Sequence, residues 1–199
     1  VTDPSVYVKF RLLDEDVELL GNEQQDSKPV YLLAWTTTPW TLPANTAVAV
    51  NSELLYDEVE VGNERFIIAS DRLDQVLTDE KHQPIAYSKL RRHKGADLVG
   101  KRYAPLLGVN RGDNAHKIWS ADYVSANDGT GLVHLAPAYG EEDFLLAKQH
   151  KIPVVHVIDA SGTYTESEWQ GENVWNINKT IAKTLHQQGD VWKIDYIRH

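Results

Sequence analysis

The sequence has no cysteine and no methionine among its 199 residues. The missing cysteine excludes disulfides, thiolate nucleophiles and metal sites with sulfur ligands, and it leaves the redox compartment undetermined. Long apolar runs are also missing, because no stretch approaches the roughly 18 residues of a membrane-spanning helix. The first ten residues lack the basic and apolar regions of a signal peptide. We therefore expect a soluble domain.

The chain starts at Val1 instead of a methionine, and its last residues before His199 contain no helix stop or turn pattern. We therefore interpret it as a segment excised from a longer protein. Its 42% hydrophobic content is enough for one compact core. We expect a single domain over residues 1–199, with neighbouring termini as in an insertion. Cytoplasm is the expected location. An organellar parent is the alternative, because a targeting segment could precede Val1.

An excess of basic residues is absent as well, and the net charge is −9. This charge argues against a domain that follows nucleic-acid phosphates over a wide surface. The run Lys89-Leu90-Arg91-Arg92-His93-Lys94 is the candidate for a small local contact with RNA. The structural alternative is a charged edge strand or loop that blocks further pairing.

Residue periodicity predicts a strand-rich chain with few helices. The predicted strands are Ser5–Leu13, Val30–Trp35, Thr46–Val50, Leu54–Val61, Arg65–Ala69 and Val191–Ile197. The predicted helices begin at Ser70, at Glu141 and near Asn176, and they end near Val76, Lys151 and Gln188. The polar stretches Glu15–Gln25 and Thr78–Gln83 are expected to be loops. This pattern favours a mixed α/β fold, a closed or nearly closed barrel-like sheet decorated by helices.

A threonine-rich run occupies residues 35–43, Trp-Thr-Thr-Thr-Pro-Trp-Thr-Leu-Pro, and Asn45 lies just beyond it. The run follows an apolar predicted strand, so its hydroxyls lie at a strand end, where side chains can line a cleft. Pro39 and Pro43 lack amide donors and disfavour helix at the preceding residues, which predicts a rigid extended loop.

A second pattern occupies residues 129–143, Gly-Thr-Gly-Leu-Val-His-Leu-Ala-Pro-Ala-Tyr-Gly-Glu-Glu-Asp. A strand here would place His134 on one face with Leu132 and Ala136. Asp143 falls in the first turn of the predicted helix, where the helix dipole and free amides favour an ionised carboxylate. The structural alternatives are a buried histidine bonded to the backbone and an ordinary acidic helix start.

The two segments resemble the signatures of the editing (CP1) domain of isoleucyl-tRNA synthetase, a class I aminoacyl-tRNA synthetase. The first resembles its threonine-rich signature, and the second resembles its G-T-G-x-V-H-x-A-P stretch followed by G-x-x-D. Relatives specific for valine and leucine usually carry T-T-R-P, whereas here Thr38 precedes Pro39. This difference favours the isoleucine branch. The resemblance is sharp over residues 30–51 and 119–164 and nearly absent between them.

The resemblance implies roles for the matching residues. Asp143 would bind the α-ammonium of the misattached amino acid, and the threonines would contact the terminal adenosine and the scissile ester. His134 is expected to be a pocket wall that limits side-chain size, with a general base as the alternative. The residues expected to be catalytic are Asp143, Thr37, Thr38 and His134. Those expected to bind substrate are Trp35, Thr36, Thr41, Asn45 and, by stacking on the terminal adenine, Tyr139.

The implied reaction is hydrolysis of an aminoacyl ester by a positioned water, because binding alone separates isoleucine poorly from valine, which lacks one methylene. The expected partners are the 3′ end of tRNA(Ile) carrying valine and the rest of an ATP-binding parent synthetase of protein biosynthesis. The alternatives are a valine-type domain acting on Thr-tRNA(Val) and a non-catalytic module that contacts tRNA. We expect a monomer without a membrane partner.

No cofactor or metal is expected, since the eight histidines are scattered and no His-Glu-x-x-His pattern occurs. The isolated tryptophans are expected to be core or loop anchors rather than platforms for base stacking. These are Trp119, Trp169, Trp175 and Trp192.

Overall fold

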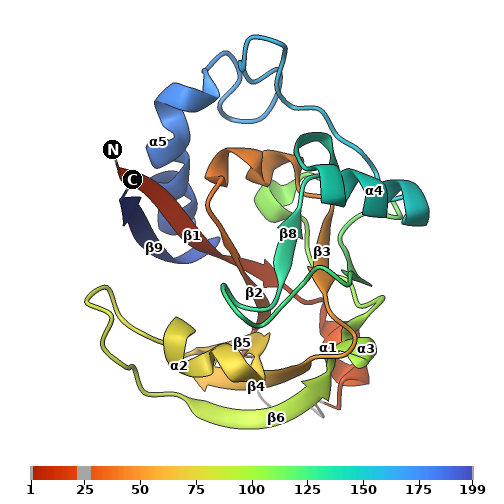
Figure 1. Ribbon diagram of the computed structural model, residues 1–199, viewed down its shortest axis with the longest axis vertical. Coiled ribbons are helices and arrows are strands. Elements are labelled where there is room, and N and C mark those ends of the chain that lie inside the picture. The colour runs from red at the N-terminus through yellow and green to blue at the C-terminus, as the bar shows by residue number, and fades with distance from the viewer. Residues whose placement is uncertain (1, 22–27, 199) are drawn as a thin grey trace.

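The computed structural model describes residues 2–21 and 28–198. A six-stranded sheet has the strand order β6-β4-β5-β2-β1-β9. Its strands are β1 (Thr2–Arg11), β2 (Val30–Thr36), β4 (Leu55–Val61), β5 (Glu64–Ala69), β6 (Ser88–Lys94) and β9 (Val191–Arg198). The pair β2–β5 is parallel, and the other pairs are antiparallel. Thr2 lies opposite Arg198, so the two ends of the described chain are neighbours, as predicted (Figure 1).

A second sheet has three strands in the order β7-β3-β8. They are β3 (Ala47–Val50), β7 (Lys117–Ser120) and β8 (Val133–Leu135). The predicted strand-rich, mixed α/β fold is confirmed. In the described chain, however, the strands form two sheets and no closed barrel. The segment after β2 turns away, so β3 pairs with β7 and β8 instead of extending the first sheet.

The helices are α1 (Asp14–Leu19), α2 (Leu73–Val76), α3 (Gly95–Leu98), α4 (Glu141–His150) and α5 (Val174–Gln187). Helix α5 buries its predicted apolar stripe, Ile177, Ile181 and Leu185. Helix α1 overlaps the predicted loop Glu15–Gln25, because Val17 is buried there; residues 22–25 of that loop lie outside the described residues. No helix of the described chain is long and apolar enough to cross a membrane.

The predicted extended loop after β2 is instead the 3-10 helix η1 (Pro39–Ala44). Pro39 begins η1, where a missing N–H breaks no hydrogen bond and the fixed φ suits the turn. The carbonyl of Thr38 accepts the Thr41 N–H at 3.0 Å. Further short 3-10 helices are η2 (Ser70–Arg72), η3 (Leu106–Gly108) and η4 (Pro137–Tyr139). Ser70 does not cap its helix, because its hydroxyl donates to Asp57 at 2.9 Å.

The Gly-Thr-Gly part of the second pattern attaches β8 to the six-stranded sheet. Gly131 has φ +80°, and a Cβ there would lie 2.3 Å from the Cβ of Ala69. The Tyr56 hydroxyl donates to the Gly131 carbonyl at 2.7 Å, and the Ala69 N–H donates to the Thr130 carbonyl at 2.8 Å. This close approach holds the loop before β8 against β4 and β5.

The basic run Lys89–Lys94 lies in β6, an edge strand of the six-stranded sheet, as in the structural alternative. Arg92 pairs with Asp57 at 2.8 Å, and Arg91 pairs with Glu58 at 3.4 Å. Although burial raises it, hydrogen bonds from Arg92 and Ser70 hold the pKa of Asp57 below its ordinary value. Part of the positive charge of β6 is therefore balanced by the carboxylates of β4.

Candidate functional site

The threonine hydroxyls at the start of η1 form a connected group. Thr36 Oγ1 accepts the Thr38 N–H at 3.1 Å and lies 3.2 Å from Thr38 Oγ1. Thr38 Oγ1 lies 3.4 Å from Thr41 Oγ1. Thr37 is exposed. The structure therefore places Thr36 and Thr38 together and separates Thr37 from them, as predicted from the alternation of an extended segment.

The imidazole of His134 joins this group to Asn45 and Tyr103. Tyr103 Oη donates to Asn45 Oδ1 at 2.6 Å, which turns the Asn45 amide nitrogen toward His134 Nδ1 at 2.8 Å. Nδ1 is then the acceptor, so Nε2 carries the proton and donates to Thr41 Oγ1 at 2.9 Å. The Thr41 hydroxyl donates onward to the Thr38 carbonyl at 3.0 Å. From Tyr103 to the Thr38 carbonyl, each group therefore donates a hydrogen bond to the next one.

His134 is held as a neutral group. Burial lowers its pKa from 6.5 to about 3, and its ring stacks on Phe10 with the centroids 6.4 Å apart. Its basic nitrogen already accepts from the Asn45 amide. This geometry favours a wall or positioning group over a general base. The hydrogen-bond partners of His134 are the side chains of Thr41 and Asn45, not the backbone groups of the structural alternative.

Asp143 lies in the first turn of α4, as predicted, but its side chain folds back toward the preceding loop. Its Oδ2 accepts the N–H of Ala136, two residues after His134, at 3.0 Å. A Cβ on Gly140 would lie only 3.0 Å from Asp143 Cγ, so glycine leaves room for this conformation. Burial, with the nearby charge of Glu142, raises the pKa of Asp143, although the helix start was expected to favour the anion.

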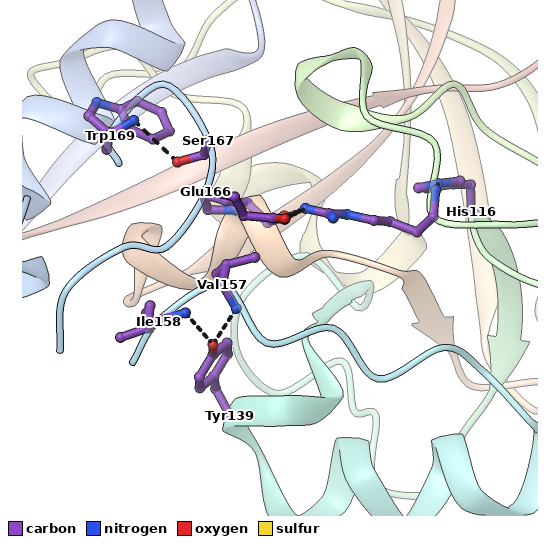
Figure 2. Close-up of polar contacts among 9 residues, drawn as sticks. His116, Tyr139, Val157, Ile158, Glu166, Ser167 and Trp169 are labelled. Atoms are coloured by element: carbon purple, nitrogen blue, oxygen red, sulfur yellow. Dashed lines mark hydrogen bonds and ion pairs between the residues drawn. The ribbon is translucent and has the colours of Figure 1, made fainter. Parts of the chain in front are cut away.

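Two of the expected substrate-binding residues have packing roles. Trp35 lies against the Gly-Thr-Gly loop, where a Cβ on Gly129 would lie 3.4 Å from its ring. Tyr139 Oη accepts the N–H groups of Val157 and Ile158 at 2.8 and 3.1 Å (Figure 2). The Tyr139 ring packs edge-on to Trp40, with the centroids 5.5 Å apart. Stacking of Tyr139 on adenine stays a prediction.

Two residues that no sequence pattern predicts also support the site. Tyr103 orients Asn45, as described above. Arg111 donates from Nη2 to the carbonyl of Pro43 at 2.9 Å and pairs with Glu166 at 2.6 Å. Both come from the middle of the chain, where neither a motif nor a periodic pattern marks them. Arg111 therefore connects the end of η1 to the segment that follows Ile158.

A cleft of about 320 Å³ lies beside Thr37 and Thr38. Its lining includes Trp40 and Trp175, and the Trp175 side chain is 79% exposed. The prediction that Trp175 is a core or loop anchor is therefore wrong, because it lies off the buried stripe of α5. The other three tryptophans pack as predicted: Trp169 is buried, Trp192 contacts Phe66, and Trp119 stacks on His150.

The arrangement offers neutral hydroxyls, a half-buried carboxylate and a neutral imidazole. A carboxylate can bind an ammonium group, while hydroxyls and amides can orient a ribose or an ester. No group of three or more histidine, aspartate or glutamate side chains in the described chain is placed to hold a metal ion. The described groups are suited to binding and orienting a substrate.

Comparisons with known proteins identify the family of the chain. Residues 31–189 match the family model for the editing domain of leucyl-tRNA synthetase. The chain is 39% identical to isoleucine-tRNA ligase 2 of Pseudomonas fluorescens, over 99% of this chain and 18% of that protein. It is 37% identical to the isoleucine-tRNA ligase of Mycobacterium tuberculosis (strain H37Rv), over 94% of this chain and 17% of that protein.

The fold also matches a solved structure. The crystal structure of the P. falciparum cytosolic leucyl-tRNA synthetase editing domain (space group P21) superposes with a TM-score of 0.73 at 11% identity. The match covers 99% of this chain and all of that one. The chain belongs to the family of synthetase editing domains, and it spans less than a fifth of the length of the curated isoleucine-tRNA ligases that it matches.

Proposed function

We propose that this editing domain hydrolyses the ester of misacylated tRNA, and that its substrate is Val-tRNA(Ile) within an isoleucyl-tRNA synthetase. The names of the curated relatives support the isoleucine branch. The observation that carries the proposal is the series of hydrogen bonds that connects Thr38, Thr41 and His134. Asp143 is anchored nearby, because its carboxylate accepts the N–H of Ala136, two residues after His134. In this proposal the threonine hydroxyls and the Asp143 carboxylate contact the same substrate.

In the proposed mechanism, Asp143 binds the α-ammonium of valine and thereby fixes the ester carbonyl. The hydroxyls of Thr36 and Thr38 orient the terminal ribose and the attacking water. No side chain becomes acylated: the water adds to the carbonyl, the ester C–O bond breaks, and the ribose oxygen leaves with a proton from the water. Rate enhancement then comes from orientation of the water and the ester.

His134 limits the size of the amino acid in this proposal. Its ring is fixed by Thr41 and Asn45 and packed on Phe10, so it cannot move aside for a larger side chain at low cost. Valine is accepted and isoleucine, with one more methylene, is excluded. A rigid neutral wall separates two apolar side chains by shape, because it carries no charge that could attract either of them.

The test is deacylation of Val-tRNA(Ile), Ile-tRNA(Ile) and Thr-tRNA(Val) by the full-length parent protein and its Asp143→Ala variant. We expect clearance of the valyl ester, survival of the isoleucyl ester, and a changed selectivity in the variant. Faster clearance of Thr-tRNA(Val) would identify a valine-type domain. No clearance of any ester by a folded protein would indicate a non-catalytic module that contacts tRNA.

A further inference from the structure

The cleft beside Thr37 and Thr38 contains an unusually exposed indole. Trp175 is 79% exposed at the start of α5, and its backbone is fixed by a hydrogen bond from its N–H to Asn173 Oδ1 at 3.1 Å. No aromatic ring of the described chain stacks on it at the distances of the other ring pairs. An exposed indole on a fixed backbone, with a free face, is suited to stacking on another planar group.

The rest of the cleft lining indicates which planar group would fit. The Trp40 ring is already packed edge-on against Tyr139, and the Trp40 backbone N–H donates to Asn178 Oδ1 at 3.2 Å. This bond leaves the NH₂ group of Asn178 to donate to an acceptor in the cleft. Thr37 and Thr38 add hydroxyls. The lining thus combines one free aromatic face with several neutral hydrogen-bonding groups.

The charge of the cleft excludes some occupants. The lining contains no lysine or arginine that could pair with a phosphate or an acidic peptide. A neutral nucleobase, whose phosphates remain outside in solvent, needs no such cationic partner. Single-stranded nucleic acid is commonly bound by aromatic side chains on which bases stack. A base is therefore the planar group that the cleft fits best.

The position of the cleft relates it to the hydrolytic site. Thr38 belongs to both the cleft and the hydroxyl chain that leads to His134, whereas His134 and Asp143 do not line the cleft. We propose that Trp175 stacks on the base that precedes the aminoacylated terminal adenosine of the tRNA. This inference rests on the proposed function, in which Thr36 and Thr38 orient the terminal ribose.

The test combines a protein variant with a substrate variant. Val-tRNA(Ile) is prepared intact and with the penultimate nucleotide abasic, and both are deacylated by the full-length parent protein carrying Trp175, Trp175→Ala or Trp175→Phe. We expect Trp175→Ala to lower kcat/KM about 5- to 100-fold, mainly through KM, and Trp175→Phe to retain most activity. Asn176→Ala, an exposed neighbour on α5, is the matched control.

The abasic substrate separates stacking from a structural role. Removing the base should cost the wild-type protein about the same factor as Trp175→Ala, and it should cost Trp175→Ala nothing further. Equal losses in both proteins would overturn the proposal, as would an unimpaired Trp175→Ala or an equally impaired Trp175→Phe. Equal losses would instead indicate that Trp175 contacts the rest of the synthetase.

Failure of the proposed function has a different signature. In that case the wild-type protein clears none of the intact misacylated tRNAs. The binding step is then measured directly, by titrating the protein with the RNA tetranucleotide ACCA and with its penultimate-abasic form. A loss of affinity on base removal that disappears in Trp175→Ala would still support the stacking site, and its absence would overturn it.

Discussion

The imidazole of His134 and the hydroxyl of Thr41 lie 2.9 Å apart, and this contact joins β8 of one sheet to the 3-10 helix that follows β2 of the other. Both side chains are buried. The two signature segments, 93 residues apart in sequence, thus meet through one directional hydrogen bond. Its strength and the neutrality of the ring can be tested separately.

Replacing Thr41 with valine should destabilise the fold. Valine has nearly the same shape but no hydroxyl, so the buried Nε2–H of His134 loses its acceptor. We expect a loss of about 1–3 kcal/mol in the free energy of unfolding. Thr41→Ser keeps the hydroxyl and should lose clearly less, because only a methyl group is removed. Urea denaturation at pH 7 measures both; equal losses would mean that the methyl packing matters more than the hydrogen bond.

The neutrality of His134 predicts a dependence of stability on pH. Its pKa in the folded protein is about 3, below the ordinary 6.5, so between these values the unfolded chain binds a proton that the folded chain does not. Stability is therefore full above pH 6.5 and falls as the pH drops toward 3. From pH 7 to pH 4.5, His134 should cost about 2–3 kcal/mol.

The matched variant for this measurement is His134→Gln, which cannot titrate in that range. Burial and the charge of Arg111 also lower the pKa of His116, so both proteins should lose some stability in acid. The wild-type protein should lose more than the variant by the amount attributed to His134. Parallel stability curves between pH 7 and pH 4.5 would show that His134 is protonated in the folded state.

Gly140→Ala should impair activity through Asp143. The new Cβ would lie 3.0 Å from Asp143 Cγ, although alanine adopts the backbone φ of −144° without strain. The carboxylate must then move away from the Ala136 N–H. We expect at least a tenfold loss in kcat/KM for deacylation with a change in Tm of only a few degrees. Glu141→Ala, exposed on the same turn, is the control and should retain activity.

The ion pair between Arg111 and Glu166 should contribute modestly to stability. Glu166 is 45% exposed, so solvent screens the pair, and Glu166→Gln should cost less than about 1 kcal/mol. Arg111→Met also removes the hydrogen bond to the Pro43 carbonyl and should cost about 1–2 kcal/mol. A double-mutant cycle in urea isolates the pair. A coupling energy above about 2 kcal/mol would contradict this view.

Much of the secondary structure could be predicted because it depends on local periodicity. The stripe of Ile177, Ile181 and Leu185 places α5 correctly, and alternation places the strand cores. The errors arose where a distant contact decides the local structure. Helix α1 overlaps a predicted loop because Val17 is buried and the Asp16 carboxylate accepts the N–H of Arg102 at 2.5 Å. Neither contact is visible in the local sequence.

Part of the candidate site could be predicted as well, because it depends on local structure. Alternation correctly separates Thr37 from Thr36 and Thr38, because side-chain direction in an extended segment is local. The roles of Asp143 and the threonines in hydrolysis stay predictions. Tyr103 and Arg111 escaped prediction, because a single tyrosine or arginine has no pattern of its own and acts here through residues 58 and 68 positions away.

The sequence by itself determined the family of this domain, its strand-rich character and the two segments that form the candidate site, since these depend on composition, periodicity and short motifs. Only the tertiary structure decided that the strands divide into two sheets, that Asn45 and Thr41 fix a neutral His134, and that Trp175 lies exposed beside Thr37. Burial and hydrogen-bond direction arise when distant segments pack, and they set the pKa and the accessibility of each group.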